Sequence, residues 1–281
     1  MMQTQIVNVQ HPLLSPFIQS FIFFTADNQQ SIEYSTFPNT NLCLAIYFNN
    51  AISYCNTNTQ NICEINAGSS LYKSRLYGFH KQPFEVKVNG SLDQICILFH
   101  PGALRAFTNV PYDDLLESDN AFDLIFSPSN RSVLERIFNL IDVSRRSRIL
   151  ESFLIDQVRP DKLNSKTHAA LAAATSLSGE LLTVTHISSK CDINPSTLYR
   201  LFYSNIGQNP KSFLQTIRFR RALKPVLYAE KEQLTNIAYS NAYYDQAHFN
   251  KEIKSLSGYT PNQLRKIASL EQKQLVWVYK S

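Results

Sequence analysis

Two basic side chains, Arg200 and Lys251, occupy equivalent positions in two similar stretches of the sequence. Each follows a short polar residue, Asn194 or Asp245, which can accept hydrogen bonds from the free N–H groups of a first helical turn. A guanidinium can bond to the O6 and N7 atoms of guanine together, and an ammonium can reach guanine or a phosphate. These residue types therefore indicate recognition of nucleic acid from the polar face of a helix.

The two stretches form a repeat in which matched residues lie 51 positions apart. They read NPSTLYRLFYSNIGQNPKSF and DQAHFNKEIKSLSGYTPNQL. Apolar residues fall four apart in both copies, so each copy predicts a helix with one apolar face. A glycine follows each helix, as is common where a chain leaves a helix in the left-handed conformation. The matched pairs are Asn194 and Asp245, Leu198 and Phe249, Arg200 and Lys251, Phe202 and Ile253, Gly207 and Gly258, Pro210 and Pro261, Phe213 and Leu264.

A second short helical segment precedes each copy. The sequence predicts these helices at 184–190 and 236–240, each followed by a tight connection. A short helix, a turn and a second helix with one polar face are typical of a helix-turn-helix unit, whose second helix enters the DNA major groove.

The polar faces of the two predicted recognition helices supply the candidate DNA contacts. Residues near the helix starts are candidates for reading bases, and others for touching the phosphate backbone. For each base-reading candidate the alternative is a surface residue that touches only phosphate. The base-reading candidates are Ser196, Tyr199, Arg200, Gln246, Ala247, Asn250 and Lys251, and the backbone candidates are Tyr203, Lys211, His248 and Lys254.

The stretch from about His168 to Lys266 resembles the AraC/XylS-type DNA-binding domain of bacterial transcription regulators. The strongest match is NIAYSNAYYDQAHFNKEIKSLSGYTPNQLRK. The resemblance implies two helix-turn-helix units bridged by a linker helix, here from Lys211 to about Tyr228. Asp192 and Ala242 stand where the family usually has glycine in each turn. Pro225 falls late in the linker helix, where it should kink or end the helix.

Length and charge predict a division into parts. The 281 residues suggest about two domains. From residue 160 onward there are 16 Lys and Arg against 8 Asp and Glu, and before it 11 against 14. A basic C-terminal part fits binding to phosphates by that part alone. We expect a strand-rich sensory domain at 1–128, a helical linker or dimerisation segment at 129–160, a DNA-binding domain at 161–270 and a C-terminal tail at 271–281.

The N-terminal part is rich in short aromatic and β-branched segments, such as NLCLAIYF, FEVKV and QICILF, separated by turn residues. They predict an antiparallel sheet or small barrel between about Glu33 and Phe99. One or two helices are predicted from Ser132 to about Gln157. The expected fold class is α+β, with a cupin-like barrel, a helical segment and then the all-α domain. The resemblance implies that the strand-rich domain senses and that the helical region dimerises.

The predicted barrel is a candidate location for a ligand or metal site. Tyr47, Tyr72, Arg75 and Phe79 are candidates for an effector pocket, although aromatics on strands are core residues first. Possible metal ligands are His80, Glu85 and His100, but no two of them lie close enough in sequence to share one strand face. We expect no metal, no cofactor and no catalytic residues.

The remaining sequence features indicate the cellular compartment of the protein. Five cysteines, without metal-type spacing, favour thiols in a reducing cytoplasm. No apolar run approaches the length of a membrane span, and the first residues lack the pattern of a signal peptide. We expect a cytoplasmic protein that does not enter membranes.

The sequence predicts a sequence-specific, effector-responsive transcription regulator, and not an enzyme. Its expected partners are double-stranded DNA, a small-molecule effector, a second copy in a homodimer and RNA polymerase. One alternative is a small-molecule-binding or metal-dependent barrel enzyme with a regulatory C-terminal domain. Another is a DNA-binding protein whose N-terminal domain only dimerises and senses nothing.

Overall fold

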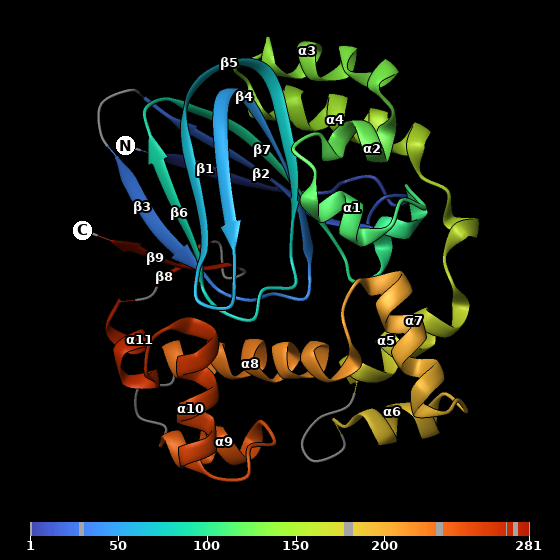
Figure 1. Cartoon of the computed structure of the whole chain (residues 1–281), viewed down its shortest axis with the longest axis vertical. Coiled ribbons are helices and arrows are strands. Elements are labelled where there is room, and N and C mark those ends of the chain that lie inside the picture. The colour runs from blue at the N-terminus through green and yellow to red at the C-terminus, as the bar shows by residue number, and fades with distance from the viewer. Residues whose placement is uncertain are drawn as a thin grey trace.

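The computed structural model describes residues 2–27, 31–176, 182–228, 233–267, 269–271 and 275–280. Figure 1 shows a curled sheet, helices α1 to α4 along one side of it, and a group of helices below that begins with α5. The expected α+β class is confirmed, with the N-terminal domain built as a half-barrel followed by helices.

The curled sheet has the order β1-β2-β7-β4-β5-β6-β3-β9-β8 among the described strands. Adjacent strands of this sheet are antiparallel, except for β5 and β6, which are parallel. The N-terminal strands are β1 (Gln3–Asn8), β2 (Ile18–Ala26), β3 (Ile32–Thr36), β4 (Leu42–Asn56), β5 (Asn61–Tyr77), β6 (Phe84–Asn89) and β7 (Leu92–Phe99).

Strand β7 shows why this sequence forms a two-sided sheet. Most of its residues are buried, because it lies between β2 and β4 and both faces of the sheet are covered there. Ile95, Ile97 and Phe99 point into one hydrophobic cluster, whereas Cys96 and Leu98 point into a second cluster on the opposite face. The period-two alternation of a strand thus feeds two cores.

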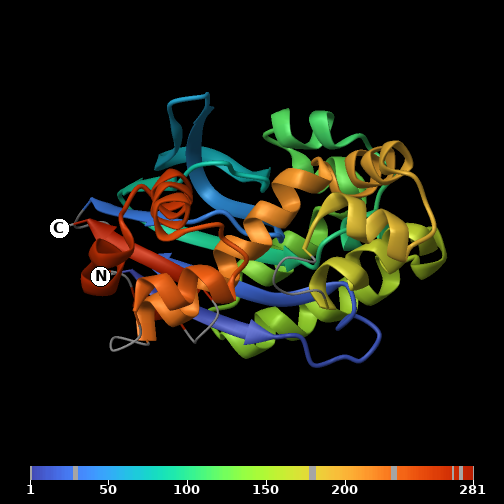
Figure 2. The same cartoon turned by 90° about the horizontal axis from the view of Figure 1, so that it is seen from below.

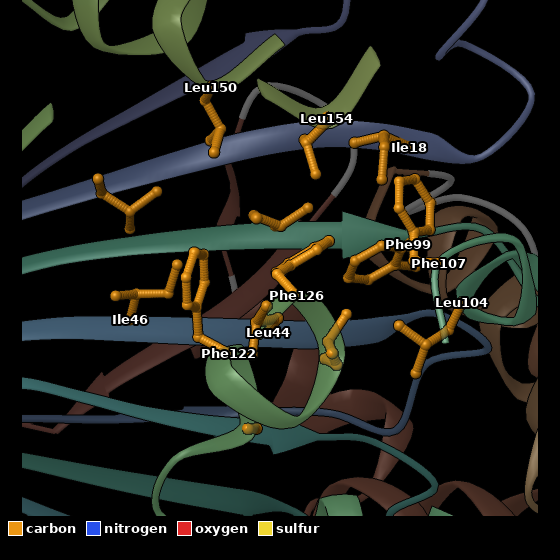
Figure 3. Packing of buried hydrophobic residues seen from close by; sticks show 14 of the residues in the cluster. Ile18, Leu44, Ile46, Phe99, Leu104, Phe107, Phe122, Phe126, Leu150 and Leu154 are labelled. Atoms are coloured by element: carbon orange, nitrogen blue, oxygen red, sulfur yellow. The ribbon is translucent and has the colours of Figure 1, made fainter. Parts of the chain in front are cut away.

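Short helices cover the face of the sheet that carries the first cluster. Figure 3 shows Phe122 and Phe126 of α2, with Leu150 and Leu154 of α4, in one cluster with the strand residues Leu44, Ile46 and Phe99. Both Arg146 Nη atoms donate to the carboxylate of Asp93, at 2.6 and 2.7 Å, and this pair joins α4 to β7. The helical elements are η1 (Ala103–Ala106), α1 (Tyr112–Glu117), α2 (Ala121–Phe126), η2 (Pro128–Asn130), α3 (Ser132–Phe138), α4 (Val143–Gln157) and η3 (Pro160–Lys162).

The C-terminal helices form two units at the ends of a long helix. Figure 1 shows α7 and α10 at opposite ends of α8. The first half of α8 packs into the core of the first unit and its second half into the core of the second. The bounds are α5 (Ser165–Ser176), α6 (Val184–Lys190), α7 (Pro195–Ile206), α8 (Pro210–Tyr228), α9 (Leu234–Ser240), α10 (Gln246–Ser257) and α11 (Pro261–Ile267).

Asp192, Ala242 and Pro225 are the three residues that depart from the pattern expected of their segments. Asp192 and Ala242, in the turns of the two units, have φ of 51° and 63°. Both adopt the left-handed conformation that glycine reaches at no steric cost. Pro225 does not end the linker helix where it stands, because α8 continues for three more residues and ends at Tyr228, as the resemblance implies.

The segment predicted as a C-terminal tail returns to the N-terminal sheet. Strand β9 (Leu275–Lys280) pairs antiparallel with β3, and β8 (Ser269–Glu271) pairs with β9. Figure 2 shows the red C-terminal strand beside the blue N-terminal ones. Two chain segments that are far apart in the sequence thus share one sheet.

Candidate nucleic-acid interface and internal cavity

Helix α7 is built as its sequence predicts. The Asn194 side chain accepts a hydrogen bond from the Thr197 N–H at 2.7 Å, and Pro195 is the first helical residue. Leu198 and Phe202 are completely buried. The helix ends at Gly207, whose φ of 85° is left-handed. These constraints leave one face of α7 exposed.

The predicted contact residues of α7 lie together on that face. Tyr199 and Tyr203 are 51% and 53% exposed, and their rings are stacked nearly parallel with centroids 6.4 Å apart. Arg200 is exposed, and its Nη2 lies 3.4 Å from Thr197 Oγ1. Ser196, Tyr199, Arg200 and Lys211 also line one open groove between the starts of α7 and α8. The structure therefore brings the first set of predicted residues into one surface.

Helix α10 repeats this construction. The Asp245 carboxylate accepts from the His248 N–H at 2.7 Å, and the helix ends at Gly258 with φ of 78°. Phe249 and Ile253 are completely buried. The exposed candidates are Ala247, His248, Lys251 and Lys254.

Two predicted base-reading residues of α10 are more restricted. Gln246 and Asn250 are partly buried, whereas Ala247, His248, Lys251 and Lys254 are exposed. Gln246 Oε1 accepts a hydrogen bond from Thr235 Oγ1 of α9 at 2.7 Å. Asn250 Oδ1 is buried without a described hydrogen-bond partner. The Thr235 bond holds the Gln246 carbonyl oxygen, whereas the Lys251 side chain is exposed, so Lys251 is more accessible than Gln246 or Asn250.

The arginines of α8 have separate surroundings. Arg218 Nη2 lies 3.3 Å from Glu252 Oε2, which joins the linker helix to α10. Arg221 Nη2 donates to the Thr175 carbonyl at 2.7 Å, which joins α8 to α5. Arg220 lines a cavity of the N-terminal domain instead. Burial lowers the pKa of Arg220 to about 10, so it stays protonated at neutral pH.

That cavity lies on the face of the sheet opposite α1 to α4 and contains about 850 Å³ of empty space, including the part open to solvent. Most of its lining is apolar or aromatic, and the polar groups are few. Such a lining is typical of a small-molecule site. The lining includes Ile22, Phe24, Tyr34, Thr36, Asn39, Asn41, Cys43, Tyr47, Tyr77, His80, Phe84, Val86, Gln94 and Arg220.

Two tyrosines of the cavity lining are hydrogen-bonded to each other. Tyr47 Oη donates to Tyr77 Oη at 3.1 Å, and Cys63 Sγ lies 3.2 Å from the same Tyr77 oxygen. Burial raises the pKa of both tyrosines well above the ordinary value and that of the Cys63 thiol to about 11. These groups are therefore neutral, which suits an apolar cavity.

The four predicted pocket residues do not form one site. Only Tyr47 lines the cavity. Tyr72 packs against Phe138 on the other face of the sheet, with centroids 5.7 Å apart. Arg75 forms an ion pair with Asp119 and donates to the Leu116 carbonyl at 3.0 Å. Phe79 packs edge-on against Tyr112.

Sequence reasoning missed the polar cavity residues for different reasons. His80 is a candidate metal ligand in the sequence and not a candidate pocket residue, and Asn39 and Asn41 lie in the connection after β3. Arg220 belongs to the C-terminal domain, so no pattern within the N-terminal sequence could have indicated it. Within the described ranges, His80, Glu85 and His100 join no group of three residues that could hold a metal ion.

Comparison with known proteins identifies the C-terminal units. Residues 187–267 match the family described as "Helix-turn-helix domain". The chain carries an AraC-type helix-turn-helix domain. Residues 10–121 match a family described as a domain of unknown function, DUF6597. No curated protein matches the chain. None of the described helices is both long and apolar enough to pass through a membrane.

Solved structures of similar proteins cover the AraC-type domain or most of the chain. The C-terminal domain of AraT, a response regulator from Geobacillus stearothermophilus, is 23% identical and covers 37% of this chain and 85% of its own, with a TM-score of 0.34. ToxT from Vibrio cholerae is 11% identical and covers 94% of this chain and 98% of its own, with a TM-score of 0.44. An unsaturated-fatty-acid-bound ToxT of the same species is 13% identical and covers 87% and 94%, with a TM-score of 0.42.

Proposed function

We propose that this chain is an effector-responsive transcription regulator that binds duplex DNA through α7 and α10. The observation that carries the proposal is the pair of capped helices, each with a buried apolar face and an exposed basic face, at the two ends of α8. With 19 residues, α8 is about 28 Å long at 1.5 Å per residue. That length approaches the separation of about 34 Å between successive major grooves on one DNA face.

Each helix has its own role in this proposal. Arg200 reads a guanine from α7, and Tyr199 contacts neighbouring groups. Lys251 contacts guanine or phosphate from α10, and the exposed Lys254 contacts phosphate. Lys211, at the start of α8, adds a cation next to free helical N–H groups, where a phosphate is favoured.

The cavity is the proposed effector site. Its apolar walls suit a mainly apolar molecule, and the protonated Arg220 suits an anionic group on it. A charged hydrogen bond of this kind is worth about 1.5–3 kcal/mol, or about 10- to 150-fold in affinity. Titration with the fluorescent apolar anion 8-anilinonaphthalene-1-sulfonate should therefore show binding that Arg220→Gln weakens about tenfold or more. Equal affinity in the two proteins would exclude Arg220 as the anion contact.

Dimerisation, contact with RNA polymerase and location in the cytoplasm belong to the same proposal. A regulator works in the compartment that holds the DNA, which is the cytoplasm in a bacterium. Both predicted recognition helices belong to one chain, so a homodimer would read two such pairs of grooves. Light scattering of the purified protein, alone and on DNA, measures whether it forms.

Selection from a random DNA library with the purified chain tests the proposed function, followed by footprinting of the enriched sequence. The expected site has two short boxes about one helical turn apart. Arg200→Ala should weaken protection of one box and Lys251→Ala that of the other. Lys166→Ala removes an exposed charge from α5 and is the matched control. Binding that is equally salt-sensitive and equally strong on every duplex would overturn the proposal.

A further inference from the structure

One short loop touches the cavity and both helix-turn-helix units. This loop, residues Gly78–Pro83, connects β5 to β6. Its residues divide between two sides. Gly78 and His80 line the cavity, as does Phe84 at the start of β6. Phe79 and Pro83 face the C-terminal helices instead.

Phe79 packs against the C-terminal end of α7. A Cβ atom placed on Gly207 would lie 2.6 Å from Phe79 Cε2 and 2.8 Å from Tyr112 Cγ, so ring and helix end are in close contact. Tyr112 Oη also donates to the Asn205 carbonyl at 2.8 Å. Phe79 itself has φ of 59°, an uncommon conformation for a bulky residue that its surroundings must enforce. The first recognition helix is thus held at its C-terminal end by this ring.

Pro83 makes the equivalent contact with α10. A Cβ atom on Gly258 would lie 3.3 Å from Pro83 Cγ. Asn61 Nδ2 donates to the Pro83 carbonyl at 3.2 Å and fixes the proline to the start of β5. Gly207 and Gly258 are equivalent residues of the two units, so one six-residue loop contacts the same point of both recognition helices.

His80 lies on the side of the loop that faces the cavity. Its ring stacks on Phe84, with centroids 4.8 Å apart and planes 23° apart. His80 Nδ1 is buried and has no hydrogen-bond partner among the described residues. A buried polar atom without a partner costs free energy that a ligand group bonded to it would recover. Phe79 adjoins His80 in the chain, so a ligand that moves His80 also moves a contact of α7.

We propose that Gly78–Pro83 is a positioning segment, in which Phe79 and Pro83 set the separation of the two recognition helices and a cavity ligand bonded to His80 alters that separation. This inference rests on the proposed function. Phe79 and Pro83 touch no DNA and act through α7 and α10. They therefore determine which spacing between two DNA boxes is accepted, and they leave recognition of each box to the helices themselves.

Spacing selectivity is the first test. The full chain and its Phe79→Ala, Pro83→Ala and double variants are titrated with duplexes whose two boxes lie at the selected spacing or 1–3 base pairs closer or farther. Wild type should discriminate among spacings, and the double variant should lose about fivefold or more of that discrimination while it binds a single box unchanged. Gln82→Ala is the matched control, because Gln82 is in the same loop and donates to the Thr57 carbonyl instead.

The proposed coupling between the cavity and the loop is tested by filling the cavity with a larger side chain. Cys43 lines the cavity and is only partly buried, so Cys43→Phe places a ring there, and Cys43→Leu is a milder form if the first variant does not fold. Filling the cavity should shift the preferred spacing in the parent, and not in the Phe79→Ala and Pro83→Ala double variant.

The outcomes separate the two proposals. Absence of two-box binding by wild type would refute the proposed function itself. Two-box binding with the same spacing profile in wild type and double variant would overturn the positioning role. An equal weakening of single-box and two-box DNA would do so too, because it would show only a structural role. A cavity effect of equal size in both backgrounds would overturn the coupling through this loop.

Discussion

At the scale of the residue, Arg200 and Lys251 carry the proposed DNA contacts, because they are exposed while the apolar residues beside them are buried. A bidentate contact with guanine is worth about 1–3 kcal/mol of discrimination. Arg200→Ala should therefore lower affinity for the selected site by about 5- to 150-fold and relax the preference for guanine at one position. Competition binding on duplexes substituted at each position measures both effects. Loss of affinity without relaxed preference would assign Arg200 to the phosphate backbone.

His80 gives a pH dependence of stability. Burial lowers its pKa from 6.5 to about 4. Between these values the unfolded chain binds a proton that the folded chain does not, so the free energy of unfolding falls as pH falls from about 6.5 to 4. Arg220, in the same cavity, stays charged over this range. His80→Gln should lose less stability than wild type between pH 7.5 and 4.5 in urea unfolding. An equal loss would show that His80 is solvated.

At the scale of the element, the ends of α7 and α10 differ in how tightly they are enclosed. Both Gly207 and Gly258 are left-handed, but only Gly207 would place a Cβ within 3 Å of neighbouring atoms. Gly207→Ala should therefore lower the free energy of unfolding by more than the roughly 1 kcal/mol expected from the backbone conformation alone. Gly258→Ala should cost close to that backbone value. Thermal unfolding of the two variants measures the difference, and equal losses would mean that Phe79 and Tyr112 give way.

The helix starts are a simpler case. Asn194 caps α7 and Asp245 caps α10 through hydrogen bonds of 2.7 Å each. Replacing either residue by alanine should lower the free energy of unfolding by about 1 kcal/mol. The matched control is Asn236→Ala in α9, because Asn236 is exposed and caps no helix start. Denaturant titration measures all three variants, and losses at the caps no larger than that of the control would contradict the capping role.

At the scale of the whole molecule, the two halves are joined at several points. Arg105 Nε donates to the Ser204 carbonyl at 3.1 Å, and Tyr112 Oη donates to the Asn205 carbonyl at 2.8 Å. Phe37 packs edge-on against Phe219 of α8. Strand β9 adds backbone pairing to β3. Together these contacts hold the N-terminal domain against α7, α8 and β9.

Removal of β8 and β9 tests the last of these contacts. A chain that ends at Ile267 leaves β3 as an unpaired edge. In hydrogen–deuterium exchange, the backbone N–H groups of β3 that donate to β9 should exchange faster in the shortened chain. The exchange rates of the N–H groups in β4 and β7 should stay the same. Unchanged exchange in β3 would show that β9 pairs too transiently to protect it.

The sequence alone predicted the helix-turn-helix units, because capping, apolar spacing and the closing glycine are all local. Asn194, Leu198, Phe202 and Gly207 each act within a few residues of one another. It also predicted the α+β class, since strand alternation is a local pattern too. The positions of Tyr72 and Arg75 outside the cavity could not be predicted, because the residues that they contact, Phe138 for Tyr72 and Leu116 and Asp119 for Arg75, belong to segments that lie far along the chain.

Only the tertiary structure decided which distant segments meet. Arg220 enters a cavity made of strands, Phe79 and Pro83 reach two helix ends, and β9 joins β3. These contacts join residues more than a hundred positions apart, and nothing in either segment's own pattern specifies the other. Local chemistry therefore determined the two capped helices that we propose to read DNA, whereas long-range packing determined the contacts that we propose to set their separation.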